Sequence, residues 1–188
     1  AYQVHKKGYH PYTVSCLSRD VMLAGYNRVI IKGDQENSMK DILTAVRNER
    51  TEDIQMMPEE PAVGEHQENG KPERAIQTIE GQVRSMRFAL EHRYQMEISE
   101  DSNIWPWLIS HAALLHHICT VGEDGRTPWE RRKGRKFNRE LPEFGENVLH
   151  LKPDSVGENK TQSRWEENGI FVGIRIESGE LIVLGEEG

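Results

Sequence analysis

An unusually apolar segment at residues 105–118 restricts the fold of this chain more than any other feature. Apart from Ser110 and three histidines, every side chain in it is apolar. A helix that is apolar on all sides is buried inside a protein. The segment is also shorter than the roughly 18 residues that indicate a membrane span. We therefore expect a buried helix here and no contact with a membrane.

The first 60 residues alternate between helical and strand-like patterns. Apolar residues recur at near-helical spacing over 12–23, and 29–31 is the continuous apolar run of a strand buried on both faces of a sheet. Ser38 with Asp41 three residues later is a helix-start signature, because both side chains can accept hydrogen bonds from free backbone N–H groups. Residues 54–56 alternate like a short strand. This order of elements predicts an α/β fold.

A long helix is expected from Pro72, because proline is tolerated at the first helical position. Glu73 lies in its first turn, at the rim of the apolar face, and Asp34 follows the strand at 29–31. Carboxylates placed by rigid elements are the ligands that Mg²⁺ prefers. On spacing alone, however, Glu73 is better explained as a partner of the helix dipole and Asp34 as a turn residue. The apolar stripe of this helix comprises Ile76, Ile79, Val83, Met86 and Leu90.

From residue 144 onward, short β-like runs alternate with Gly, Asn and Ser turns, which predicts a small β-rich segment. We therefore expect three parts: a core at 1–124, a basic linker at 125–143 and a β-rich C-terminal segment at 144–188. The net charge of −7 argues against nucleic acid as a partner, but 126–139 holds seven basic residues and one acidic residue, a net +6. This run indicates a nuclear-import or nucleic-acid patch, or equally a solvated linker.

Cysteine and histidine usage gives weaker signals. Cys16 and Cys119 are far apart, so a reducing compartment is expected. His111, His116 and His117 lie near Cys119 on the apolar helix, but they do not share one face. They are therefore more typical of core histidines than of a zinc site.

Several motifs together resemble the catalytic core of retroelement integrases, in particular those of copia-type retrotransposons. Gly33-Asp34-Gln35-Glu36 follows the strand-like run, and His66-Gln67-x-Asn69-Gly70-x-x-Glu73 follows an acidic loop. Thr127-Pro128-x-Glu130, Phe144-Gly145 and Gly169-Ile170-Phe171-Val172-Gly173 then occur in the family's order. The similarity covers residues 28–174.

The resemblance implies an RNase H-like fold, incomplete in its sheet, and DNA integration by a polynucleotidyl transferase that uses Mg²⁺ or Mn²⁺. Asp34 would be the second acid of the Asp, Asp, Glu triad and Glu73 the third, both as catalytic residues and as metal ligands. The implied partner is DNA, both element ends and target, and a homo-oligomer is compatible. The nucleic-acid-binding residues would be His66, Gln67, Asn69, Lys71, Arg74 and Gln77.

The chain departs from the family's pattern at its start. Only 33 residues precede Asp34, so the family's first strands, first triad Asp and zinc-binding region have no counterpart here. We therefore expect an N-terminally truncated piece of a retroelement polyprotein that is inactive alone, nuclear or cytoplasmic and not secreted. The alternatives are a non-enzymatic nucleic-acid or protein interaction module and a related RNase H-like nuclease. His66 is also compatible with an ordinary solvated loop histidine.

Overall fold

The computed structural model describes residues 1–4, 7–32, 36–49, 54–59, 70–151 and 165–185. The chain divides into an N-terminal unit, residues 2–75, and a C-terminal unit, residues 76–188 together with Ala1. Each unit has a hydrophobic core of its own. The described residues form a mixture of helices and strands with two small sheets, which agrees with the expected α/β class at this coarse level.

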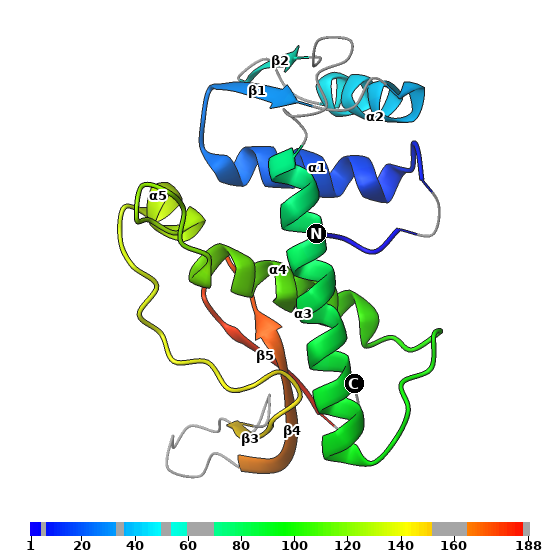
Figure 1. Cartoon of the computed structure of the whole chain (residues 1–188), viewed down its shortest axis with the longest axis vertical. Helices are drawn as coiled ribbons and strands as arrows, with labels where there is room; N and C mark the ends of the chain where they lie inside the picture. The colour runs from blue at the N-terminus through cyan, green and yellow to red at the C-terminus, as the bar shows by residue number, and fades with distance from the viewer. Residues whose placement is uncertain (5–6, 33–35, 50–53, 60–69, 152–164, 186–188) are drawn as a thin grey trace, which may run out of the picture. The chain divides into compact units, whose positions relative to one another are not determined.

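The N-terminal unit contains a β–α–β arrangement preceded by a helix (Figure 1). Helix α1 (Pro11–Ala24) leads into strand β1 (Arg28–Lys32), and helix α2 (Asn37–Asn48) connects β1 to strand β2 (Gln55–Glu59). The two strands pair in parallel, with Arg28 opposite Gln55 at one end of the ladder. A parallel pair needs a crossover connection, and α2 provides it.

The core of the N-terminal unit lies between its two helices. Val14 of α1 and Val46 of α2 are almost fully buried, and Met56 of β2 packs against their cluster. The expectation that the strand at 29–31 is buried on both faces is wrong, because Ile30 is 60% exposed and its β2 neighbour Met57 is 40% exposed. Side chains alternate between the faces of a strand. The helices contact the Met56 face, and the Ile30 side chain lies on the other.

Both ends of α1 have common capping interactions, whereas the start of α2 differs from the expectation. Nδ1 of His10 accepts a hydrogen bond from the Tyr12 N–H, and Gly25 ends α1 with a left-handed φ of 72°. Helix α2 begins at Asn37 with Glu36 as its N-cap residue, and that side chain makes no capping hydrogen bond. Ser38 therefore lies inside the first turn, where its hydroxyl donates to Glu36 at 3.2 Å, and the expected Ser38 cap is wrong.

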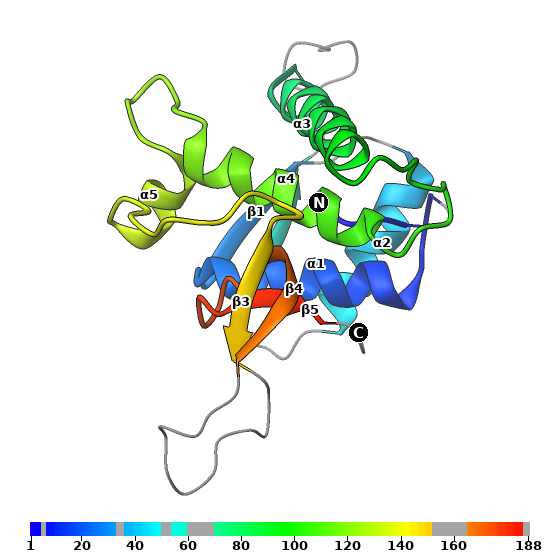
Figure 2. The ribbon, with the colours of Figure 1, turned by 90° about the horizontal axis from the view of Figure 1, so that it is seen from below.

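The C-terminal unit combines helices with an antiparallel sheet (Figure 2). Helix α3 (Gly70–Tyr94) spans the boundary between the units and is followed by α4 (Trp105–Cys119) and the short α5 (Pro128–Lys133). Strands β3 (Asn147–Leu151), β4 (Trp165–Ile174) and β5 (Leu181–Leu184) form a sheet in that order. The predicted β-rich runs are thus strands.

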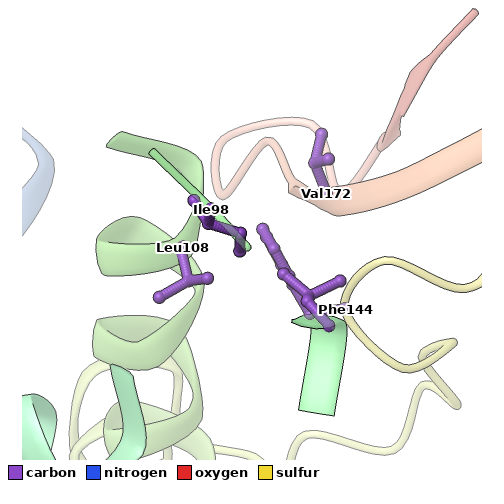
Figure 3. Packing of buried hydrophobic residues seen from close by; sticks show 5 residues of the cluster. Ile98, Leu108, Phe144 and Val172 are labelled. Atoms are coloured by element: carbon purple, nitrogen blue, oxygen red, sulfur yellow. The ribbon is translucent and has the colours of Figure 1, made fainter. Parts of the chain in front are cut away.

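One core joins these helices to the sheet. Leu90 of α3, Leu108 of α4 and Val172 of β4 lie in the same buried cluster, together with Ile98 and Phe144 (Figure 3). Leu108 is fully buried, whereas Pro106, Ser110 and His117 are exposed, so the helix predicted at 105–118 is buried on one face and not on all sides. Because the sheet shares this core, its apolar face is covered by α3 and α4.

In the Phe144-Gly145 pair, the glycine backbone lies close to the side chain of Leu90 in this core. Gly145 has φ 77°, its N–H donates to the Phe171 carbonyl at 2.8 Å, and its own carbonyl accepts from the Tyr94 hydroxyl at 2.7 Å. A Cβ atom at residue 145 would lie 2.0 Å from Cδ2 of Leu90. Glycine is therefore required here both for its backbone conformation and for space.

We expect Gly145→Ala to lower the free energy of unfolding of the C-terminal unit by about 2–3 kcal/mol, from left-handed strain plus overpacking. Gly125→Ala is the matched control, because Gly125 has φ 73° and no atom within 4 Å of the added Cβ. The control should lose only the strain contribution, about 1 kcal/mol. Urea denaturation of both variants measures the difference, and equal losses would show that the Leu90 contact is unimportant.

Candidate functional site

Glu73 is exposed in the first turn of α3. The expectation that it borders the core is wrong, because Ile76, the first residue of the predicted apolar stripe, is 56% exposed. The part of α3 that packs is its second half, where Val83, Met86 and Leu90 meet the core of the C-terminal unit. The carboxylate of Glu73 is thus presented to solvent by a rigid helix, a position that suits a ligand of a hydrated cation.

Two of the expected nucleic-acid contacts lie in the first two turns of this helix. Arg74 and Gln77 are both exposed on α3. Residues four apart lie on the same face of a helix, so Gln77 is stacked one turn beyond Glu73. Helix α3 also begins two residues before the expected start at Pro72, at Gly70. The start of α3 therefore exposes one carboxylate, one guanidinium and one amide group.

The structure does not describe the side chains of the remaining predicted site residues. For Lys71 the structure describes the helical backbone and not the side chain. The other four residues lie outside the described part of the chain. They are Asp34, His66, Gln67 and Asn69. The convergence of Asp34 and Glu73 on one metal ion therefore stays a prediction.

The described part of the chain contains no group of three or more His, Cys, Asp or Glu side chains arranged to hold a metal ion. On α4, His111 is 4% exposed and lies against the rings of Phe144 and Phe171. His116 Nδ1 lies 3.0 Å from the Thr120 hydroxyl, and His117 is exposed. The expectation of core histidines therefore holds for His111 alone, because His116 is half-buried and His117 is exposed.

The Thr127-Pro128-x-Glu130 motif is a helix cap. The Thr127 hydroxyl accepts from the Glu130 N–H at 3.1 Å, and the Glu130 carboxylate accepts from the Thr127 N–H at 2.7 Å. The backbone N–H of Thr127 is the main reason that the pKa of Glu130 is lowered. The motif thus orients α5 at the start of the basic residues. Its spacing, Thr-x-x-Glu, is a capping-box signature that could have revealed this role from the sequence.

Comparison with known proteins adds no family to this description. No model of a known protein family matches the chain, and no curated protein matches it. Within the described residues, no helix is at once long and apolar enough to span a membrane.

Proposed function

We propose that this chain is part of a retroelement-type integrase core, a polynucleotidyl transferase with an RNase H-like fold that binds DNA. The observation that carries the proposal is the exposed carboxylate of Glu73 in the first turn of a long helix that follows a parallel β–α–β unit. The motifs at Asp34, at 66–73 and at 127–130, in their family order, support the same assignment.

Asp34 and Glu73 are the residues that would hold the metal ion. Their donor chemistry fits, because hard divalent cations such as Mg²⁺ and Mn²⁺ bind carboxylate oxygens and keep several waters. When bound, such ions activate the attacking oxygen and stabilise the leaving oxygen of a phosphodiester. The chain's own contribution is to supply the two carboxylates and to place Arg74 and Gln77 near Glu73 on α3, where they can contact phosphate oxygens.

Titration calorimetry with Mn²⁺ tests the metal site. We expect Asp34→Asn and Glu73→Gln each to weaken Mn²⁺ binding by at least about tenfold. Glu80→Gln is the matched control: Glu80 is an exposed acid on α3, paired with Arg84 at 3.9 Å, and its loss should leave binding unchanged. Changes of twofold or less in the first two variants would contradict the proposal.

Strand-transfer activity is expected to be absent from this chain alone, because a triad with two acids lacks one set of metal ligands. The measurement is Mg²⁺-dependent joining of a labelled oligonucleotide end to a plasmid, with Glu73→Gln alongside the wild type. Joining by the wild type that disappears in Glu73→Gln would show that the two acids are sufficient.

A nucleic-acid interaction module without catalysis is the second candidate. The observation that favours it is the exposed basic surface around α5, which does not depend on either acid. This candidate would be selected over the integrase core if the chain binds DNA and Asp34→Asn binds Mn²⁺ as the wild type does.

A further inference from the structure

The residues 126–139 around α5, named here the basic segment, form a dense positive surface in the C-terminal unit. Seven basic residues and one acidic residue give it a net charge of +6, while the rest of the chain carries −13. Figure 2 shows α5 at the edge of the C-terminal unit, followed by an extended stretch that leads to β3. The basic residues with exposed side chains are Arg126, Arg131, Lys133, Arg135, Lys136 and Arg139.

Local contacts link the basic segment to itself and to its neighbours in the chain. The Trp129 and Phe137 rings pack edge to face with centroids 5.1 Å apart, and Lys133 Nζ lies 5.8 Å from the centre of the Trp129 ring. At the far end, the Arg139 guanidinium donates to the carbonyl of Gly179. The capping box described above fixes the start of α5. A surface that is already ordered loses less conformational entropy when it binds a ligand.

Not all of the positive charge is equally available. Arg131 is paired with Asp124, to which its Nε donates at 2.9 Å, and this guanidinium holds the pKa of Asp124 well below its usual range. Glu130 is engaged by the cap. Arg135 and Lys136, by contrast, are exposed just beyond Gly134, which ends α5, and neither forms an ion pair with another described residue. The charges best placed to meet a ligand are therefore those of residues 135 and 136.

We propose that the basic segment is a binding surface for the phosphate backbone of double-stranded nucleic acid, separate from the Asp34 and Glu73 site. Duplex DNA carries about one negative charge per 1.7 Å and releases condensed counterions when cations neutralise its phosphates. That gain opposes the repulsion between the duplex and the net negative remainder of the chain. Five of the seven basic residues are arginines, whose planar guanidinium groups match phosphate oxygens in pairs.

Acidic peptides and anionic membranes fit the surface less well. An extended acidic peptide spaces its charges at about 3.3 Å or more and has no comparable condensed layer of counterions. Basic membrane-binding segments combine their charges with exposed apolar side chains. In the basic segment the two aromatic side chains, Trp129 and Phe137, are half-buried against each other.

Fluorescence anisotropy with a labelled 20-base-pair duplex, without metal and at several salt concentrations, tests the proposal on the full chain. We expect the double variant Arg135→Ala/Lys136→Ala to weaken binding by at least about tenfold and to reduce the salt slope by about two. The matched control is Lys40→Ala/Arg47→Ala, which removes one exposed lysine and one exposed arginine from α2. This control should keep the wild-type affinity.

Three further arms make the result decisive. Arg135→Lys/Lys136→Arg should restore binding to within about threefold of the wild type, because it keeps both charges. The Arg135→Ala/Lys136→Ala variant should bind Mn²⁺ like the wild type in titration calorimetry, so failure of this surface is distinguishable from failure of the metal site. Equal losses in both alanine double variants, an unchanged salt slope, or equal binding of polyglutamate or phosphatidylserine vesicles would overturn the proposal.

Discussion

Replacing Phe171 by alanine is expected to lower the free energy of unfolding of the C-terminal unit by about 3–5 kcal/mol. Phe171 is fully buried on β4, and its ring lies edge-on to His111 at 5.7 Å between centroids. Its backbone also joins the sheet to the preceding loop, through hydrogen bonds with Gly145 and Glu146 at 2.8 and 2.9 Å. The truncation would leave a cavity that the neighbouring α4 and β4 backbones cannot close.

Tryptophan fluorescence during urea denaturation is the suitable measurement, because all four tryptophans lie within 76–188 and report the C-terminal unit alone. Phe88→Ala on α3 is the matched control, since Phe88 is 71% exposed. Its loss should change the stability by less than about 0.5 kcal/mol. If the two alanine variants unfold at the same urea concentration, the Phe171 side chain is not buried in the folded protein.

The second large effect is a loss of stability in acid that depends on His111. Burial lowers the pKa of His111 from 6.5 to about 4, and its Nδ1 has no hydrogen-bond partner within the described part of the chain. Between pH 6.5 and 4, His111 is therefore protonated in the unfolded chain but neutral in the folded unit. Above pH 6.5 the histidine is neutral in both states and costs no stability. As the pH falls from 6.5 through 4, the free energy of unfolding decreases by about 3 kcal/mol because of this group.

The difference between wild type and His111→Leu isolates this contribution, because other titrating groups are common to both. The variant should lose less stability than the wild type between pH 7 and 4. Leu114→Ala, which truncates a buried side chain on the same helix that does not titrate, should keep the wild-type pH dependence. Parallel pH profiles for the wild type and His111→Leu would mean that His111 is solvated or paired in the folded protein.

The two proposals place different demands on the two units. The metal proposal depends on the acids Asp34 and Glu73, whereas the duplex-binding proposal depends on the charge and geometry of the residues around α5. DNA binding by the basic segment would position a nucleic acid without any chemistry, and the chemistry would need Glu73. The calorimetry and the anisotropy measurements therefore test independent properties of one chain.

The local elements of this protein could largely be predicted from its sequence. The apolar segment at 105–118 and the β-like runs after residue 144 fold as expected, because hydrophobic period and turn residues act over a few neighbours. The Thr127 and Glu130 cap is equally local, and its spacing alone is sufficient to identify it. Charge clustering in 126–139 is likewise a property of composition.

Packing between distant residues decided the rest. The run 29–31 has the same apolar side chains whether one face or both are covered, and only its pairing with β2 and the position of α1 and α2 leave Ile30 exposed. The expected position of Glu73 beside the core is wrong for a similar reason, because the apolar pattern of α3 does not say which of its turns are covered. The stripe of α3 is periodic from Ile76 onward, yet only its later turns meet partners such as Phe144. Burial depends on the partner surface, which a pattern within one helix does not specify.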